Sequence, residues 1–247
     1  MKYSHEQILK IMQSELYPLS NKYDPDWILQ NWMGSHCLWL QEALATEMHL
    51  FRGQHILDLG CGKALSSIFL AKEYGVNVWA TDLWNKATEN LERIQNMNVV
   101  DKVYPIQADA NELPFADGFF DALVSINALL FFTPDGHFLK NHVFRHIKSG
   151  GEIGVVIPGF YEQYGTIPDE LKPYWHPDID KWHTLEWWTN AFLESGMVDI
   201  IRADTFPNQE GNTIYRKSTM MVNSHDNPFN ALAVDNITFI RIIAKKK

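Results

Sequence analysis

Short apolar runs alternate with helix-forming segments through the middle of the chain. All but the last of these runs end at or beside Gly, Asp or Asn, which is typical of a buried strand that leads into a turn. These runs predict strands at residues 56–59, 76–82, 102–108, 118–127 and 152–157. Apolar positions at helical spacing lie between them and predict helices that include residues 65–71, 86–97 and 137–146. This alternation predicts an α/β domain of the doubly wound, Rossmann-like class, with helices on both faces of a mostly parallel sheet.

The pattern changes before the first strand, where only helices are predicted. Amphipathic segments predict three of them, at residues 8–16, 26–33 and 36–48. We interpret residues 1–52 as a helical cap that covers the sheet. The turn at residues 31–36 gathers polar, aromatic and glycine residues, and it is our candidate for a cover over a ligand.

The C-terminal third contains fewer regular elements. A helix capped by Thr184 is predicted to end near Gly196. Apolar runs at 198–206 and 237–243 predict two further strands. Asn, Gly and Pro recur between these strands, so residues 207–236 are predicted to be irregular or partly helical and to provide a substrate or dimer contact.

Composition narrows the class of protein. The chain has 247 residues, of which 46% are hydrophobic, and this supports one domain with one sizeable core. The net charge of −9 and the lack of a basic stretch, apart from residues 245–247, argue against nucleic acid and against stable membrane association. Its two cysteines, Cys37 and Cys61, are expected to be reduced, which together with the lack of a signal peptide predicts a cytoplasmic protein.

A glycine loop follows the first predicted strand. Gly60 and Gly62 would let a ligand approach the backbone, and the next helix would present unpaired N–H groups there. A dinucleotide site needs a third glycine where this chain has Leu65. Asp58 would repel a pyrophosphate but suits an ammonium group, so the loop favours a zwitterionic ligand. An ordinary tight turn is the alternative interpretation.

A second acid lies where a ribose would be recognised. Asp82 ends the second strand and follows Gly60 by 22 residues, the spacing at which a neighbouring parallel strand places a carboxylate beside a ribose. Its alternative role is to cap a helix that starts near Asn85. Leu83 and Trp84 follow, where apolar side chains could lie against an adenine ring.

These residues resemble the motifs of the class I S-adenosylmethionine-dependent methyltransferases. Asp58, Gly60 and Gly62 match the first motif, although Ala64 replaces its third glycine. Asp109 and Ala110 match the positions that bind the adenine amino group and a ring nitrogen, although Asp109 could instead stabilise a short turn. The resemblance covers residues 53–158, in which Ser149 replaces the usual proline before the fifth strand.

The resemblance implies both a cofactor and a complete fold. S-adenosylmethionine would be converted to S-adenosylhomocysteine, and Asn127 would lie near the reacting methyl group or serve only as a strand-end turn residue. The sheet would have seven strands, the last of which is reversed. A single domain would then consist of the cap, the cofactor-binding half at 53–158, a variable substrate region with the sixth strand at 159–236, and the last strand at 237–247.

The matched motifs identify neither the methyl acceptor nor a catalytic base, so we consider the variable segment after the fifth strand. Residues 160–183 are rich in aromatic residues, Pro and acids, and are predicted to form a lid at the carboxyl ends of the strands. Three aromatic residues of the following helix are predicted to be core: Trp187, Trp188 and Phe192. Candidates for a catalytic base are His36, Glu162, Asp180 and His183. We assign no metal-binding residues.

Three functions follow from this pattern. The first is methyl transfer to a small molecule, for which a homodimer is compatible with the sequence. The second is a lipid modification like that of the cyclopropane synthases, which an acidic surface disfavours at anionic membranes. The third is a sensor that binds S-adenosylmethionine without catalysis.

Overall fold

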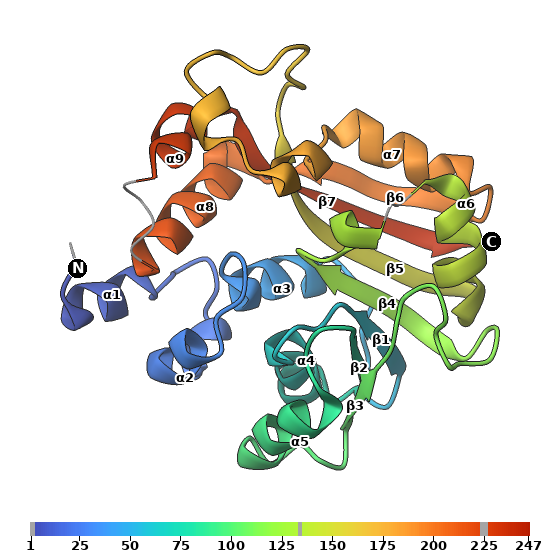
Figure 1. The fold of residues 1–247 in the computed structure, drawn as a ribbon. Helices are drawn as coiled ribbons and strands as arrows, with labels where there is room; N and C mark the ends of the chain where they lie inside the picture. The colour runs from blue at the N-terminus through green and yellow to red at the C-terminus, as the bar shows by residue number, and fades with distance from the viewer. Residues whose placement is uncertain (1–2, 133–134, 223–226) are drawn as a thin grey trace.

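A single seven-stranded sheet runs through the protein. The structure is a computed structural model, and it describes residues 3–132, 135–222 and 227–247. Over these residues the strands lie in the order β3-β2-β1-β4-β5-β7-β6 (Figure 1). The first five are parallel, and β7 is antiparallel to both of its neighbours. Their bounds are β1 His55–Leu59, β2 Asn77–Asp82, β3 Val103–Gln107, β4 Phe120–Ile126, β5 Ile147–Phe160, β6 Val198–Thr205 and β7 Ile237–Lys246. The predicted doubly wound sheet with a reversed last strand is confirmed.

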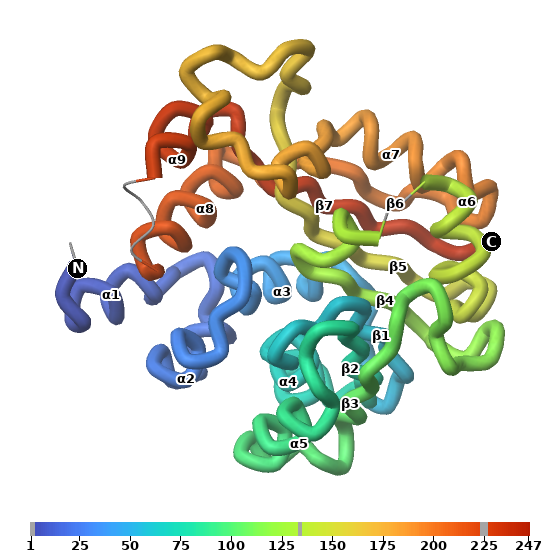
Figure 2. The backbone as a smooth tube through the Cα atoms, in the orientation of Figure 1, coloured from blue at the N-terminus to red at the C-terminus, as the bar shows by residue number. Residues whose placement is uncertain are grey.

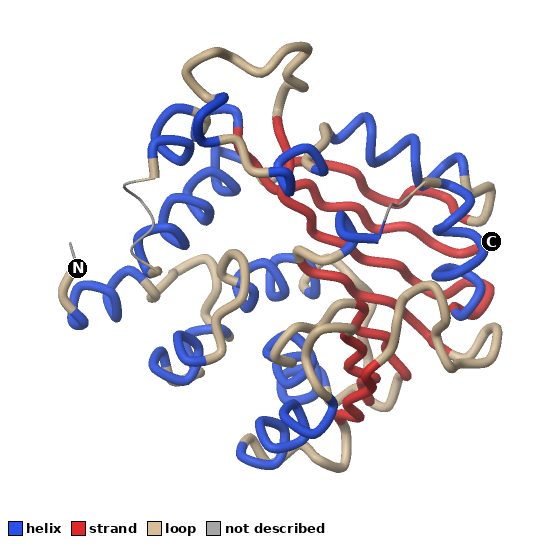
Figure 3. Tube along the Cα trace, viewed as in Figure 1, coloured by secondary structure: helices blue, strands red, loops and turns tan. Residues whose placement is uncertain are grey.

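Helices cover both faces of the sheet, which Figure 3 shows as blue segments on either side of the red strands. One face carries α3 (Cys37–Ala45), α4 (Leu65–Tyr74), α5 (Ala87–Asn96) and α8 (Glu210–Met221). The other face carries α6 (Gly136–Phe138) and α7 (Leu185–Glu194). Shorter helices lie outside these layers: α1 (His5–Ile11), α2 (Pro25–Gln30) and α9 (Pro228–Leu232). Among the described residues no helix has both the length and the apolar character needed to span a bilayer.

Side chains of the central strands point alternately into two cores. Ile56 and Val78 are fully buried beneath α3 and α4, whereas Leu57 and Leu123 are fully buried on the opposite face. A strand with both faces covered needs apolar residues at successive positions, because neither face meets water. This explains why the central strands appear as continuous apolar runs in the sequence.

Two segments around the start of β5 differ from the sequence-based expectation. Residues 137–146 do not form one α-helix, because α6 continues as a π-helix at Leu139–Val143 and a 3-10 turn at Phe144–His146. The fifth strand starts at Ile147 rather than at 152, with a shift of register against β4. Residues 207–236, predicted to be irregular or partly helical, contain the 12-residue helix α8, which packs on β7.

The prediction for the aromatic residues of α7 is partly wrong. Trp188 and Phe192 are fully buried, as predicted, but Trp187 is 39% exposed. Trp187 stacks on His183 with ring centroids 3.8 Å apart, so it covers the start of the helix and is not part of the core.

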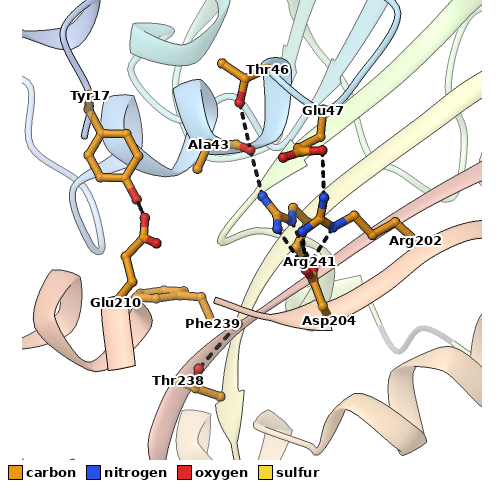
Figure 4. A network of polar contacts seen from close by, with 10 residues as sticks. All are labelled: Tyr17, Ala43, Thr46, Glu47, Arg202, Asp204, Glu210, Thr238, Phe239 and Arg241. Carbon is orange, nitrogen blue, oxygen red and sulfur yellow. Dashed lines mark hydrogen bonds and ion pairs between the residues drawn. The ribbon is translucent and has the colours of Figure 1, made fainter. Parts of the chain in front are cut away.

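The N-terminal helices are attached to the C-terminal half of the chain. Figure 2 shows the N-terminal segment beside α8, and α1 contacts that helix directly. Tyr17 donates a hydrogen bond to Glu210, and Arg241 of β7 donates to the carbonyl oxygen of Ala43 at 3.0 Å (Figure 4). These contacts fix where the following turn, at residues 31–36, lies relative to the sheet.

Candidate functional site

A cavity of about 700 Å³ opens at the carboxyl ends of the parallel strands. The strand order reverses between β1 and β4, which is where open α/β sheets bind their ligands. The volume lies in the range of roughly 300–1,000 Å³ that is usual for small-molecule sites. Eight of the nine residues predicted to bind the cofactor lie on the wall: Gly60, Gly62, Asp82, Leu83, Trp84, Asp109, Ala110 and Asn127.

The glycine loop forms the floor beside β1. Gly60 adopts a φ of +75°, and a Cβ atom there would lie 2.3 Å from the Cβ atom of Ala128. The backbone N–H groups of Gly60 and Cys61 both donate to the carbonyl oxygen of Thr81, at 2.9 Å. Ala64 adopts a φ of +62° before α4 begins, so the substituted third glycine keeps a left-handed conformation. The loop is therefore tied to β2 on one side and pressed against the end of β4 on the other.

Asp82 connects this loop to the end of β2. Its Oδ2 atom accepts from the N–H of Gly62 at 2.9 Å. Its Oδ1 atom accepts from the N–H groups of Trp84 and Asn85, at 2.9 and 2.7 Å, and from the Asn85 side chain. Oδ2 retains an acceptor site, since a carboxylate oxygen has two lone pairs. Asp82 thus stabilises the turn after the strand and also faces the cavity; α5 begins later, at Ala87.

Asp109 lies on the exposed rim of the cavity, after β3. Its Oδ1 atom accepts from the backbone N–H of Asn111 at 2.9 Å and from the Asn111 side chain at 2.8 Å. These hydrogen bonds lower the pKa of Asp109, so its carboxyl group is ionised at neutral pH. The turn role considered for this residue is present in the structure, and both bonds use the same oxygen atom.

Asn127 presents an unsatisfied amide to the cavity. It adopts a φ of +57°, a conformation that asparagine tolerates better than most residues. Its side-chain nitrogen and oxygen atoms are both buried, and neither has a hydrogen-bond partner. A buried polar group without a partner is unfavourable, so these atoms indicate that a polar ligand completes the site.

Asp58 is the one predicted cofactor residue that does not lie on the wall. It is fully buried behind the glycine loop, and its Oδ2 atom accepts from Ser66 Oγ and Ser67 Oγ at 2.6 Å each. Burial raises the pKa of Asp58 to about 6, although the two serine hydrogen bonds act in the opposite direction. Its Oδ1 atom is buried without a partner. Two of the three predicted acids therefore line the cavity, and the third lies beneath it.

The turn predicted as a cover lies across the glycine loop. Asn31, Trp32, Met33, Gly34 and Ser35 all line the cavity. The sulfur atom of Met33 lies 3.1 Å from the place that a Cβ atom of Gly62 would occupy, and Trp32 Nε1 donates to the Gly34 carbonyl oxygen at 2.7 Å. The cap therefore contributes one wall of the site.

None of the four candidate bases lies on the cavity wall. His36 is fully buried at the N-terminus of α3, where it stacks on Trp39 at 4.0 Å, and burial lowers its pKa to about 3. This position contradicts a proton-accepting role toward a ligand in the cavity.

The other three candidates also have structural contacts. Glu162 exchanges hydrogen bonds with Asn236 through its backbone, and Asp180 accepts from the Trp175 indole at 2.7 Å. His183 is half-buried against Trp187, and burial lowers its pKa. Because none of the three lines the cavity, the structure gives no support to any of them as the base.

The residues on the far side of the cavity were not predicted individually, although two of them, Asp178 and Trp182, lie in the segment 160–183 that was predicted to be a lid. They come from the segment after β4, from α6 and its π-helical extension, and from the lid: Phe131, Phe132, Asp135, His137, Phe138, His142, Asp178 and Trp182. They follow no recognisable motif. One usable signal was present, because apolar residues repeat at a spacing of five in Phe138, Leu139, Val143 and Phe144, which is longer than an α-helical turn.

Comparison with known sequences shows that this chain is similar to methyltransferases. Residues 56–151 match the family model for a methyltransferase domain. A demethylmenaquinone methyltransferase from Lactiplantibacillus plantarum is 31% identical over 152 residues, which cover 58% of this chain and 59% of that protein. The chain spans about three fifths of the length of the curated relatives it matches.

Solved structures share the fold at low identity. The phosphoethanolamine N-methyltransferase 2 of Haemonchus contortus, in complex with S-adenosyl-L-methionine, is 19% identical with a TM-score of 0.72, and the match covers 97% of this chain and 60% of that one. A geranyl diphosphate C-methyltransferase from Streptomyces coelicolor is 15% identical with a TM-score of 0.70, and the match covers 84% and 78%. The predicted fold is therefore shared with enzymes that act on different acceptors.

Proposed function

We propose that this chain is a class I S-adenosylmethionine-dependent methyltransferase, as its match to the methyltransferase-domain family model supports, and that it transfers a methyl group to a small-molecule acceptor. One observation carries the proposal. The cavity brings together the ends of four parallel strands, each with the residue types that this family uses for its cofactor, and leaves further volume bounded by aromatic side chains.

The residues present fit this cofactor. Asp82 would accept from the ribose hydroxyls through Oδ2, while Asp109 and the N–H of Ala110 would bind the adenine edge. The unpartnered amide of Asn127 would bind the amino-acid end. Asp58 would act from beneath the loop, because a buried carboxylate favours a nearby ammonium group.

When bound, the cofactor would supply a methyl group on its sulfonium for in-line attack by an acceptor atom, and S-adenosylhomocysteine would be the leaving group. The protein contributes by aligning the acceptor and by excluding water. Aromatic rings also stabilise a nearby positive charge. Phe131, Phe132 and Trp182 line the part of the cavity that extends from the end of β4 toward the lid, so they are suited to hold the acceptor.

The charges on the wall favour a neutral or cationic acceptor. Lys63 donates to the Gln30 carbonyl oxygen, and Lys181 pairs with Asp178 at 2.8 Å while it lies 4.7 Å from the centroid of Phe131. Lys63, the one lysine among the described lining residues, and Lys181, which pairs with the lining residue Asp178, thus both have polar partners, whereas carboxylates line the wall. An anionic acceptor would find little compensation for its lost hydration.

We expect this preference to appear in a matched pair of ligands. 2-Phenylethylamine should bind the complex of the protein with S-adenosylhomocysteine at least about tenfold more tightly than 3-phenylpropanoate, because one attractive ion pair near the surface is worth up to about 1 kcal/mol and a repulsion of similar size is avoided. Isothermal titration measures both affinities. Equal or tighter binding of the carboxylate would contradict the proposed acceptor class.

The proposal also covers the partners of the protein and its location in the cell. We propose a freely dissolved acceptor, no nucleic-acid partner and a cytoplasmic location. Cys37 and Cys61 are unpaired, and burial raises the pKa of Cys37 to about 12, which keeps its thiol protonated. Sedimentation analysis would determine whether the chain forms a homodimer.

The central experiment measures binding and turnover separately. Isothermal titration with S-adenosylmethionine and S-adenosylhomocysteine should show one site per chain. A screen of amine, phenol, carboxylate and thiol acceptors for release of S-adenosylhomocysteine should then show turnover. A chain that binds neither nucleoside at millimolar concentration would contradict the proposal, and a chain that binds but never turns over would be a sensor.

Asp82→Ala is expected to weaken the binding of S-adenosylhomocysteine by about 1 to 3 kcal/mol, because a charge-assisted hydrogen bond to the ribose is lost. Titration calorimetry provides the measurement. Asp199→Ala is the control, since Asp199 is an exposed acid of β6 that pairs only loosely with Lys247, at 3.4 Å. Unchanged affinity in Asp82→Ala would remove the ribose assignment.

A further inference from the structure

The π-helical segment and the last residue of α6 before it each present a ring to the cavity. The turn at Leu139–Val143 interrupts the helix that follows β4, and such turns are rare and frequent at functional sites. Phe138 and His142 both lie on the cavity wall, and their rings stack with centroids 5.3 Å apart and an angle of 22° between the planes. The stack fixes the plane of the imidazole ring.

A hydrogen bond determines which ring nitrogen of His142 carries the proton. The Nδ1 atom lies 2.8 Å from the backbone carbonyl oxygen of Asn111. A carbonyl oxygen can only accept, so Nδ1 holds the proton. In the neutral ring Nε2 is then left with a free lone pair, and it is the acceptor that His142 can offer to a ligand.

This histidine belongs to the adenine side of the proposed site. Its partner Asn111 lies in the loop after β3, two residues from Asp109, and all three residues line the cavity. The acceptor side is bounded instead by Pro158 of β5 and by Trp182, and β5 is separated from β3 by three strands. The bond to Asn111 therefore holds His142 beside the residues assigned to the adenine ring.

An adenine amino group has two N–H donors, and the site described so far provides one acceptor for it. Asp109 would accept one of them, while its Oδ1 atom already accepts twice from Asn111. We infer that Nε2 of His142 accepts a hydrogen bond from the second N–H of the adenine amino group. This inference rests on the proposed function, and it makes His142 a residue that distinguishes adenine from bases without that amino group.

The test compares two ligands that differ only at this group. Titration calorimetry is performed with S-adenosylhomocysteine and with its analogue in which hydrogen replaces the 6-amino group. In His142→Phe the stack on Phe138 can persist while the acceptor is lost. We expect S-adenosylhomocysteine to bind about 3- to 10-fold more weakly to this variant, as for the loss of one hydrogen bond, and the analogue to bind as before.

Two further variants keep the test decisive. His49→Phe changes an exposed histidine that pairs with Glu152 and does not line the cavity, and it should leave both affinities unchanged. His142→Gln provides an amide oxygen as acceptor and should restore part of the preference for the amino group. Thermal unfolding followed by circular dichroism checks that each variant is folded.

The outcomes separate this inference from the proposed function. A ratio of the two affinities that is the same in the unmodified chain and in both His142 variants would overturn the inference while leaving the cofactor assignment intact. If His142→Phe loses turnover while the ratio of the two affinities is unchanged, the inference is also overturned. That result would indicate that His142 acts as a base on the methyl acceptor and not as a partner of the adenine amino group. An unmodified chain that binds neither ligand would overturn the proposed function and this inference together.

Discussion

Asp204→Ala is expected to lower the free energy of unfolding by about 3 kcal/mol, because it leaves a buried charge without its partner. Asp204 accepts hydrogen bonds from Arg241 at 3.0 and 2.8 Å and from Arg202 at 2.8 Å (Figure 4). Arg241 is only 5% exposed, and without Asp204 it keeps a hydrogen bond to the Ala43 carbonyl oxygen and a contact with the Phe206 ring, neither of which supplies a negative charge. Chemical denaturation at neutral pH measures the loss.

Arg202→Ala is the matched control, since it removes the other arginine of the same network. Arg202 is 38% exposed and pairs with both Asp204 and Glu47. Exposed ion pairs contribute little, so this change should lower the free energy of unfolding by less than about 1 kcal/mol. Equal losses in the two variants would show that burial of Arg241 is not the cause.

The same network predicts a dependence of stability on pH. Burial acts to raise the pKa of Asp204, but the hydrogen bonds from Arg241 and Arg202 outweigh it and hold the pKa below its ordinary value. A carboxyl group with a lowered pKa in the folded state stabilises the protein above its unfolded pKa of about 3.9. That contribution is lost as the pH falls below this value, and Asp204→Ala should show a shallower loss of stability over the same range.

The ion-pair network around Asp204 also connects the stability of the fold to ligand binding in the cavity. Arg241 and Arg202 connect β7 and β6 to Ala43 in the last turn of α3 and to Glu47, two residues beyond that helix. The cap that begins with α1 and includes α3 also carries the turn that covers the glycine loop. Weakening the network should therefore weaken cofactor binding as well, although Asp204 lies outside the cavity wall.

The sheet could be predicted because its strands are buried on both faces. Mostly apolar runs such as 56–59 and 120–126 need no tertiary information to be recognised as strands. Helix α8 was harder to predict, because Asn and Gly cluster at its start, at residues 208–212, and Asn recurs after its end. Its apolar face, which includes Ile214 and Met221, packs under the cap, and that contact depends on the tertiary fold.

The candidate site likewise contains some residues that could be predicted from the sequence and others that could not. Residues at strand ends follow a fixed spacing, so Gly60, Asp82 and Asp109 could be placed together from the sequence. Asp135, Asp178 and the two histidines of the cavity wall lie on irregular segments, and only the folded chain shows that they are neighbours. Chemical type alone led to His36, which burial among aromatic rings excludes from the cavity.

Gly60→Ala is expected to lower the free energy of unfolding by about 2 to 5 kcal/mol and to weaken S-adenosylhomocysteine binding at least about tenfold. Two causes add. Alanine at a φ of +75° is strained, and its Cβ atom would lie 2.3 Å from Ala128 and 3.5 Å from Phe132. Both neighbours line the cavity, so relief of the clash would displace the wall at the end of β4.

Two variants separate these causes. Gly118 has a φ of +63°, and no atom lies within 4 Å of the position that a Cβ atom would occupy there, so Gly118→Ala should show the conformational strain alone, about 1 to 2 kcal/mol. The double change Gly60→Ala with Ala128→Gly removes the methyl group that the new side chain meets, and should recover about 1 to 3 kcal/mol of the loss. Denaturation curves and titration calorimetry on the three proteins provide the comparison. If the double variant is no more stable than Gly60→Ala, close approach of the loop to β4 is not what requires glycine there, and the wall at this point is less tightly packed than its geometry implies.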